Sequence, residues 1–304
     1  MLQAKEASFG SSQPVAIITG ASRGIGRAIA LTLAERDRMV LVLAAKSRVS
    51  RANLPGTVQS VADECLARGA AAVLPFPLDV RDDQGIERMV HETLQRFGRI
   101  DVLVCNAGAL WWKPVAETPL ERFDLVHGVN ARGSFACARA VLPAMVRQKT
   151  GLIITMSPPV ELDALPGMTG YLISKFGMTM LVHGLGGELA GTGVTSVALW
   201  PATMVESFAT KNFQLGDRSQ WRKASIIADC VHMLLHDPER NALSGRALID
   251  EDYMRSRGIR DFSQYRCDPD VEPERAWPPR KPWASTAKDP RALPPGVSLA
   301  PSKL

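Results

Sequence analysis

The chain has 304 residues, of which 46% are hydrophobic and 22% are charged, and its formal net charge is +5. This length suits one large α/β domain or two small ones. No apolar run approaches the ~18 residues that a membrane-spanning helix needs, so we expect no membrane span. The basic residues are dispersed rather than gathered in a stripe with aromatic residues, which argues against nucleic-acid binding.

The five cysteines are scattered along the chain, without Cys-x-x-Cys or nearby histidine spacing: Cys65, Cys105, Cys137, Cys230 and Cys267. This pattern favours a reducing compartment and argues against a disulfide framework or a structural zinc site, so no metal site is predicted. The first residues carry a glutamate and lack an apolar core. We therefore expect residues 1–13 to form a flexible leader rather than a signal peptide.

A glycine-rich turn follows the first apolar run. Val15–Thr19 reads as a strand, Gly20-Ala-Ser-Arg-Gly24-Ile-Gly26 as a turn, and residues from about Arg27 to Arg36 as a helix. Glycines let the backbone approach a ligand closely, and the free N–H groups at the start of a helix suit a pyrophosphate. The spacing differs from Gly-x-Gly-x-x-Gly. An ordinary strand–helix turn is the alternative, but a nucleotide-binding loop is favoured.

Basic residues follow the second expected strand, Met39–Ala44. A site that prefers NAD usually has an acidic residue here to hold the ribose 2′-hydroxyl. This chain instead has Lys46 and Arg48, with Arg23 in the glycine turn. Cations around a 2′-phosphate would favour NADP(H) over NAD(H). The alternative interpretation is that these are solvated loop charges.

Short apolar runs alternate with helical patterns along the rest of the chain. The further expected strands are Ala71–Phe76, Asp101–Cys105, Leu152–Met156, Val194–Trp200 and Ala247–Asp250, and the helices are at about 57–68, 82–97, 119–147, 171–190 and 224–236. This alternation predicts a doubly wound parallel sheet. The polar segment 204–222 contains aromatic residues, and such segments often cover a binding cleft. A plain surface excursion is the alternative.

Tyr171 and Lys175 are the strongest candidates for acid–base chemistry. They stand four residues apart in an expected helix and so share one face. We expect the ammonium of Lys175 to lower the pKa of the phenol, which could then exchange a proton with a carbonyl or alcohol oxygen. Ser157 follows a strand, where ligands bind in open α/β sheets. Asn130 either caps a break in its helix or serves the chemistry.

These motifs together resemble those of the short-chain dehydrogenase/reductase family: Thr19-Gly20-x-x-x-Gly24-x-Gly26, Asp79, Asn106-Ala107-Gly108, Asn130, Ser157 and Tyr171-x-x-x-Lys175. The resemblance covers about residues 14–250. It implies a Rossmann-type sheet of about seven strands and an NAD(P)-dependent hydride transfer. Cys105, where the family usually has an asparagine, and Pro201-Ala202, in place of Pro-Gly, depart from the pattern and leave the substrate open.

The resemblance also assigns roles. Tyr171 would be the general acid/base, and Lys175 would lower its pKa and bind the nicotinamide ribose. Ser157 would orient the substrate oxygen, and Asn130 would support a water relay to Lys175. Asp79 would hold the adenine amino group. The full expected set of cofactor-binding residues is Gly20, Ser22, Arg23, Gly24, Ile25, Gly26, Lys46, Asp79, Val80, Asn106, Ala107, Gly108, Tyr171, Lys175 and Thr203.

A closer likeness to a peroxisome-associated member of the family is visible in segments outside these motifs. They are Ala44-Ala-Lys46-Ser47, Leu54-Pro-Gly-Thr57, Ser157-Pro-Pro159, Ala198-Leu-Trp-Pro201 and Leu248-Ile-Asp-Glu-Asp252. That member carries an additional sterol-carrier-like domain, for which this chain is too short. The likeness therefore concerns the dehydrogenase part alone.

We expect one domain over residues 14–267 and an extended tail over residues 268–304. Nine of the 21 prolines lie in this tail, which excludes a helix or central strand there. The tail ends in Ser302-Lys303-Leu304, an address read by the peroxisomal import receptor. The expected location is therefore the peroxisome in a eukaryote and the cytoplasm otherwise.

The predicted function is an NADP(H)-dependent oxidoreductase that interconverts a carbonyl and an alcohol on an apolar, lipid-derived small molecule. A dienoyl-CoA-type reductase ranks lower, because such reductases often depart from the Tyr171-type acid. The alternative is a catalytically silent NADP(H)-binding sensor or interaction protein. By family analogy, the helices at 119–147 and 171–190 pair subunits into a homo-oligomer, either a tetramer or a dimer.

Overall fold

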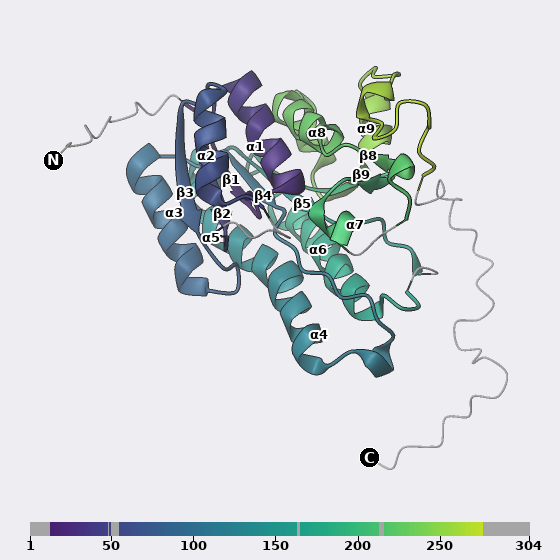
Figure 1. Cartoon of the computed structure of the whole chain (residues 1–304). Coiled ribbons are helices and arrows are strands. Elements are labelled where there is room, and N and C mark those ends of the chain that lie inside the picture. Colours follow the sequence, from purple (N-terminus) through teal and green to yellow (C-terminus); the bar gives the residue numbers. More distant parts are fainter. Residues whose placement is uncertain (1–12, 48, 50–54, 163–164, 213–215, 276–304) are drawn as a thin grey trace, which may run out of the picture.

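The computed structural model describes residues 13–47, 49, 55–162, 165–212 and 216–275. The predicted leader up to residue 12, Arg48, and the tail beyond residue 275 with its Ser-Lys-Leu end lie outside the described residues. Within them, helices cover both faces of a central sheet (Figure 1). This arrangement confirms the predicted doubly wound α/β fold.

The described residues form one seven-stranded sheet in which every pairing is parallel. The order is β3 (Ala72–Pro77), β2 (Val40–Ala45), β1 (Val15–Thr19), β4 (Val102–Cys105), β5 (Gly151–Met156), β6 (Val194–Trp200) and β9 (Arg246–Ile249). The five strands in the middle of the sheet are buried along their whole length: β2, β1, β4, β5 and β6. Burial on both faces explains why their sequences are continuous apolar runs rather than alternating ones.

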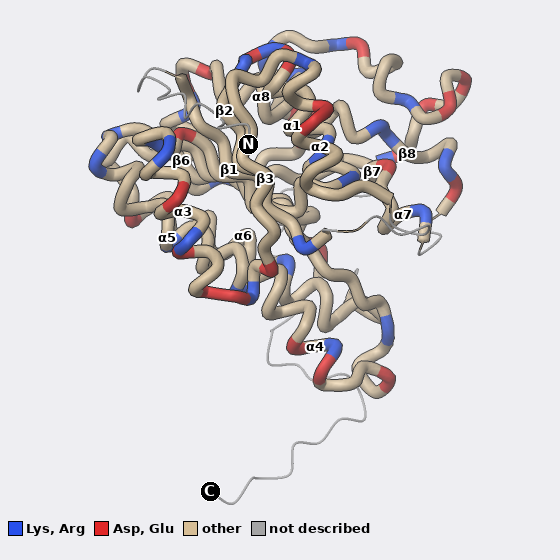
Figure 2. Tube along the Cα trace, turned by 60° about the vertical axis from the view of Figure 1, so that its left-hand side comes forward, with Lys and Arg blue, Asp and Glu red and all other residues tan. Residues whose placement is uncertain are grey.

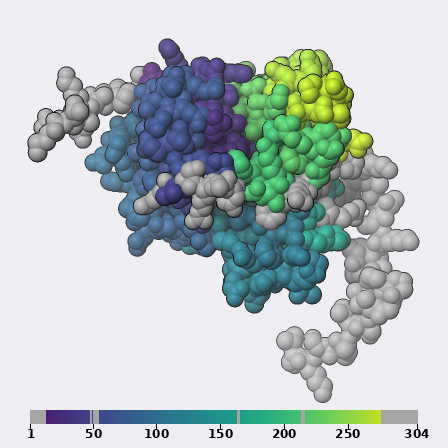
Figure 3. Space-filling view, in the orientation of Figure 1, coloured from purple at the N-terminus to yellow at the C-terminus, as the bar shows by residue number. Residues whose placement is uncertain are grey.

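The two faces of the sheet carry separate apolar cores. One core joins the sheet to α1 (Gly24–Asp37), α2 (Val58–Ala67), α8 (Ser225–His236) and α9 (Asp250–Ser256). The other joins it to α3 (Asp83–Phe97), α5 (Gly133–Gln148) and α6 (Thr169–Glu188). The teal segment with α4 (Leu120–His127) extends beyond the body of the domain (Figures 1 and 3).

Local signals fix the helix ends. The side chain of Asp82 accepts a hydrogen bond from the N–H of Gly85 at the start of α3, and Gly98 ends that helix with φ +77°. These are the usual N-cap and C-cap residues. The predicted helix over 119–147 is confirmed as a continuous helical backbone from Leu120 to Gln148, but it contains a π-helical turn at Gly128–Arg132, between α4 and α5, that the sequence did not predict.

The 204–222 segment contains β7 (Met204–Val205), α7 (Phe208–Asn212) and β8 (Trp221–Arg222). The Arg222 side chain is fully buried and ion-paired with Glu251 and Glu272. Glu272 lies beyond the predicted boundary at residue 267. The described part of the predicted tail, residues 268–275, is therefore held against the domain by at least one ion pair.

Figure 2 shows basic and acidic positions interspersed along the described chain. Many are ion-paired with each other, as Arg27 is with Glu64 and Arg68 with Glu35. Among the residues that the structure places, no helix has both the length and the apolar character to cross a membrane.

Candidate active site

The glycine turn after β1 requires glycine at three positions. Gly20 and Gly24 have φ of +66° and +55°, in the region that favours glycine. A Cβ on Gly26 would lie 2.5 Å from the carbonyl oxygen of Gly20 and 2.6 Å from Nδ2 of Asn106. The backbone is therefore closely packed where α1 begins, at the carboxyl end of β1. The N–H groups in the first turn of a helix have no partner within the helix.

Asn106 braces this turn from the next strand. Its Nδ2 donates to the carbonyl oxygens of Thr19 and Gly20, at 3.0 and 3.3 Å. The hydroxyl of Thr19 accepts from the backbone N–H groups of Asn106 and Ala107 and donates to the carbonyl oxygen of Val104. The Asn-Ala-Gly motif therefore holds the glycine turn in place, in addition to the expected lining role.

The expected adenine residue, Asp79, is engaged by two cations. Arg81 binds both of its carboxylate oxygens, with the shortest contact at 2.7 Å, and Nζ of Lys46 lies 3.5 Å from Oδ2. The hydrogen bond from Arg81, aided by the charge of Lys46, lowers the pKa of Asp79 to about 2. Asp79 is therefore ionised, and Lys46 stands beside it rather than alone in solvent.

Arg23 lies in the glycine turn and reaches across to the loop after β2. Its guanidinium donates to Oγ of Ser47 at 2.8 Å and to the carbonyl oxygen of Gly56 at 3.0 Å. Arg23 and Lys46 therefore border the carboxyl ends of β1 and β2. Arg48, the third expected cation, lies outside the described residues.

Asn130 lies in the π-helical turn and is fully buried. Its Oδ1 accepts from the N–H of Ala109, and its Nδ2 donates to the carbonyl oxygen of Ala109 and to Oγ of Ser174. A Cβ on Gly108 would lie 3.6 Å from Oδ1 of Asn130 and 3.7 Å from Nζ of Lys175. Asn130 therefore has hydrogen-bond partners for its own polar groups within the π-helical turn, and Gly108 lies between it and Lys175.

Tyr171 and Lys175 both come from the first two turns of α6, as predicted. The ammonium of Lys175 is buried and donates to the carbonyl oxygen of Met156 at 2.9 Å. The half-buried ring of Tyr171 lies edge-on to Trp112, with centroids 6.0 Å apart. The structure brings both side chains to one pocket with Ser157 and Asn106.

The predicted lowering of the tyrosine pKa was wrong for the protein without ligand. Burial raises the pKa of Tyr171, because removing the phenolate from water costs more than any favourable charge nearby returns. Burial also lowers the pKa of Lys175, to about 8, since its charged form is desolvated too. Tyr171 is therefore a neutral phenol at pH 7.

Ser157 is held by two side chains that the sequence did not single out. Its Oγ lies 2.8 Å from Oγ1 of Thr179 and accepts a hydrogen bond from Nε1 of Trp200 at 3.1 Å. Thr179 and Trp200 are themselves hydrogen-bonded. The sequence signal was weak, because Trp200 closes an apolar run that reads simply as a buried strand.

A pocket of about 520 Å³ opens at the carboxyl ends of β4, β5 and β6. Its lining includes six of the predicted residues: Ile25, Asn106, Ser157, Tyr171, Lys175 and Thr203. The side of the pocket near Tyr171 is apolar, with Leu110, Trp112, Met168 and Leu172. Met204, Val205, Ser207, Ala209 and Thr210 add a wall from the 204–222 segment, which therefore borders the cleft.

Two other predicted residues are buried and are not among the residues that line the pocket. Ser22 is buried within the glycine turn. Val80 is buried under α5, where a Cβ on Gly133 would lie 2.8 Å from it.

The comparisons agree with this geometry. A family model described as short chain dehydrogenase matches residues 14–216. The hydroxysteroid dehydrogenase-like protein 2 of Danio rerio is 38% identical over 257 residues, which are 83% of this chain and 60% of that protein. The chain thus spans less than two thirds of the length of this curated relative.

Two solved structures are similar over most of the chain. One, from Xanthomonas campestris and described as a dehydrogenase, has a TM-score of 0.82 and 38% identity, and covers 90% of this chain and 100% of that one. An alcohol dehydrogenase from Thermococcus sibiricus, complexed with 5-hydroxy-NADP, has a TM-score of 0.67 and 29% identity, and covers 78% and 96%. The chain therefore belongs to the short-chain dehydrogenase family of NAD(P)(H)-dependent oxidoreductases.

Proposed function

We propose that the protein is an NADP(H)-dependent oxidoreductase that interconverts a carbonyl and an alcohol, with Tyr171 as the general acid/base. The observation that carries this proposal is the meeting of Ser157, Tyr171 and Lys175 in one pocket, beside the glycine turn. A hydride transfer coupled to a proton transfer needs a cofactor-binding turn and a proton-transfer group close together, and both lie here at the carboxyl ends of the strands.

The residues present fit a nicotinamide dinucleotide, which supplies or accepts the hydride when bound. Gly20 and Gly24 have left-handed backbones, and a Cβ on Gly26 would clash within the turn, so all three positions need glycine. Such a turn before a helix lets a pyrophosphate approach the backbone closely. Asn106 keeps this turn in shape. Ala107, Gly108 and Thr203 would border the path towards Tyr171.

Tyr171 would transfer its proton to the substrate oxygen as a carbonyl is reduced. Burial keeps the phenol protonated, which suits this direction. The reverse reaction needs the phenolate, which the cation of Lys175 would stabilise. Ser157 would donate to the same substrate oxygen, and Asn130 would help to hold water near Lys175.

We assign a preference for NADP(H) to Arg23 and Lys46. Arg23 and Lys46 are the cations at the ends of β1 and β2, and no acidic residue stands in the stretch of sequence after β2, where an NAD site would need one. Lys46→Ala should raise the KM for NADPH and leave the KM for NADH unchanged. An equal effect on both coenzymes would remove this part of the proposal.

The apolar wall near Tyr171 supports an apolar substrate. Leu110, Trp112 and Met168 offer a large hydrophobic surface, and burial of apolar area is the main source of affinity in such pockets. We therefore assign a lipid-derived carbonyl or alcohol rather than a sugar or an amino acid.

The proposal is tested by following NADPH and NADH consumption with acyl-CoA, steroid, retinoid and small aromatic carbonyls. Tyr171→Phe should abolish turnover and keep NADPH binding. Tyr253→Phe is the matched control, since the Tyr253 hydroxyl donates to Asp237 and neither residue lines the active-site pocket. Wild-type turnover in Tyr171→Phe would overturn the mechanism. Tight NADPH binding without turnover on any substrate would favour a cofactor-responsive binding protein.

We also infer a homo-oligomer, a dimer or a tetramer, formed through α4, α5 and α6. Large apolar side chains are exposed on these helices, among them Leu120 (77%), Phe135 (57%) and Met180 (71%). Burial of these side chains against a second subunit would remove their apolar surface from water. Light scattering should give a multiple of 33.0 kDa, and Met180→Glu should reduce it. A monomeric wild type would contradict this inference.

Peroxisomal import through Ser302-Lys303-Leu304 completes the proposal. The tripeptide matches the receptor-read signal. A fluorescent protein fused in front of the chain should enter peroxisomes in eukaryotic cells, and a version without the tripeptide should remain outside. Identical distributions would refute the assignment.

A further inference from the structure

A cluster of three metal-ligating side chains lies outside the proposed active site. Asp37 is the last residue of α1, and His232 and His236 lie one turn apart near the end of α8. Oδ2 of Asp37 lies 2.9 Å from Nδ1 of His232, and Oδ1 lies 2.6 Å from Nε2 of His236. The three ligand atoms all lie within 4.8 Å of one another.

We propose that Asp37, His232 and His236 bind a divalent transition-metal ion, with Zn²⁺ the best match. Two imidazole nitrogens and one carboxylate are a donor set that zinc takes in proteins, and a fourth position remains for water. Histidines at i and i+4 of a helix present their rings to the same side. Imidazole donors also disfavour Mg²⁺ and Ca²⁺, which prefer oxygen.

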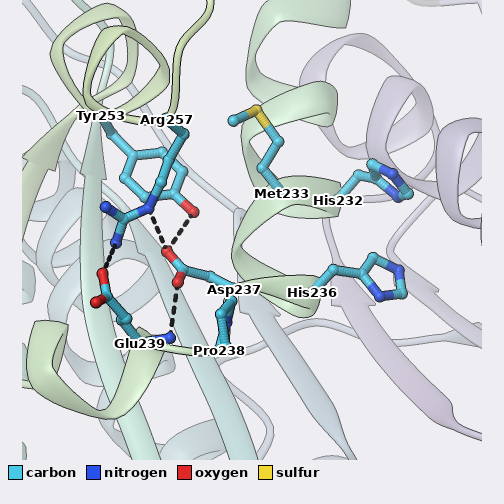
Figure 4. Close-up of a pocket in the computed structure, with 8 residues that line it drawn as sticks. All are labelled: His232, Met233, His236, Asp237, Pro238, Glu239, Tyr253 and Arg257. Carbon is cyan, nitrogen blue, oxygen red and sulfur yellow. Dashed lines mark hydrogen bonds and ion pairs between the residues drawn. The ribbon is translucent and has the colours of Figure 1, made fainter.

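The positions of the ligands suit this role. The Asp37 side chain is only 5% exposed, so its carboxylate is held in place by its surroundings. The His236 side chain is 60% exposed, so an ion and its bound water can reach it. Figure 4 shows both imidazoles extending from α8 towards the purple helix, and a pocket of about 370 Å³ adjoins them.

The backbone around the cluster favours a cation. Asp37 ends α1 and His236 ends α8, and the two helices pack beside each other against one face of the sheet (Figure 1). The carbonyl ends of both helices therefore meet near the cluster, and these ends carry a partial negative charge.

Neighbouring charges are engaged elsewhere. Arg36 pairs with Asp229 at 3.2 Å. Asp237 is not a ligand, because its carboxylate accepts from Tyr253, Arg257 and the N–H of Glu239, on the other side of the pocket (Figure 4). Arg36 therefore pairs away from the site, and Asp237, the second acid near the histidines, does not compete for the ion.

The ion would link α1 to α8 at the amino ends of the strands, opposite the active site. The chain enters α1 from the glycine turn at Gly24 and leaves it at Asp37, just before β2 begins. Binding there should stabilise the helix whose other end holds the glycine turn, without touching the reacting groups. The sequence prediction of no metal site weighed the cysteines and did not weigh His232-x-x-x-His236.

The test uses tag-free, chelator-treated full-length protein titrated with Co²⁺ and Zn²⁺. One equivalent of Co²⁺ should produce the visible absorption of a nitrogen- and oxygen-ligated cobalt ion, and Zn²⁺ should displace it. A Zn²⁺ concentration 100 times the Kd should raise the Tm by about 5 °C. The chain has five histidines, and all lie among the described residues.

Variants separate this site from surface binding. His236→Gln and Asp37→Asn should abolish the cobalt absorption and the Tm shift, whereas His91→Gln, at an exposed position of α3, should keep both. Since the His236 side chain is largely exposed, His236→Gln should fold normally. Binding that is absent in the wild type, or unchanged in His236→Gln, would overturn the proposal.

Discussion

The indole Nε1 of Trp200 donates a hydrogen bond to Oγ of Ser157, at 3.1 Å. The serine hydroxyl also lies 2.8 Å from Oγ1 of Thr179. Ser157 is therefore held in one orientation by the end of β6 and by the second half of α6. A hydroxyl that must meet a substrate oxygen gains from being positioned before the substrate binds.

Trp200→Phe should lower kcat/KM by about 2- to 10-fold, because one hydrogen bond contributes about 0.5–1.5 kcal/mol. Phenylalanine is smaller than tryptophan but keeps an aromatic ring in the apolar surroundings, so the strand should still form. Thr195→Val is the matched control, since Thr195 lies at the other end of β6 and bonds to Asn241 away from the pocket. Steady-state kinetics of both variants decide the matter, and equal losses would show a general effect of β6.

Lys175→Met should raise the Tm at pH 7 and lower kcat by about 100-fold or more. Burial lowers the pKa of Lys175 to about 8, below its unfolded value. Below pH 8 the folded state therefore holds a desolvated charge at a cost in stability, and methionine removes that cost. Calorimetry and kinetics measure the two effects. A variant that loses stability, or one that retains activity, would contradict this account of Lys175.

Asp250→Asn should flatten part of the dependence of stability on pH. Asp250 is buried, its Oδ1 accepts from the N–H groups of Ala202 and Glu251, and burial raises its pKa to about 7. The folded pKa exceeds the unfolded value near ~3.9. The stabilising contribution of the protonated acid is therefore complete below about pH 4 and lost as the pH rises to about 7.

Urea unfolding at several pH values tests this prediction. The free energy of unfolding of the wild type, relative to Asp250→Asn, should fall between pH 4 and pH 7. Asp124→Asn, at an exposed position on α4, should show no such trend. Parallel curves for the wild type and Asp250→Asn would rule out Asp250 as the titrating group.

Gly26→Ala should destabilise the protein by about 1–3 kcal/mol, as overpacking does, and weaken NADPH binding. The new Cβ would lie 2.5 Å from the carbonyl oxygen of Gly20, which the turn cannot move without losing its shape. Gly187→Ala is the control, because Gly187 is an exposed helical residue with nothing within 4 Å of the new Cβ. Fluorescence titration with NADPH should separate the two variants.

Much of the fold was predictable because it rests on local patterns. The buried strands are continuous apolar runs, and the glycine turn and the Tyr171–Lys175 pair need only a strand and a helix around them. The π-helical turn between α4 and α5 was not predictable in the same way. Asn130 is satisfied there by Ala109 and Ser174, and those contacts exist only after the chain has folded.

The sequence by itself determined the doubly wound sheet and the glycine turn, since periodicity and chain order place that turn at the carboxyl end of a parallel strand. The tertiary structure alone decided the environment of the site residues. Burial raises the pKa of Tyr171 against the expectation from its neighbour Lys175, and packing brings Asp37 to histidines almost 200 positions away. Desolvation and contacts between distant segments depend on all the elements together, and no local pattern contains them.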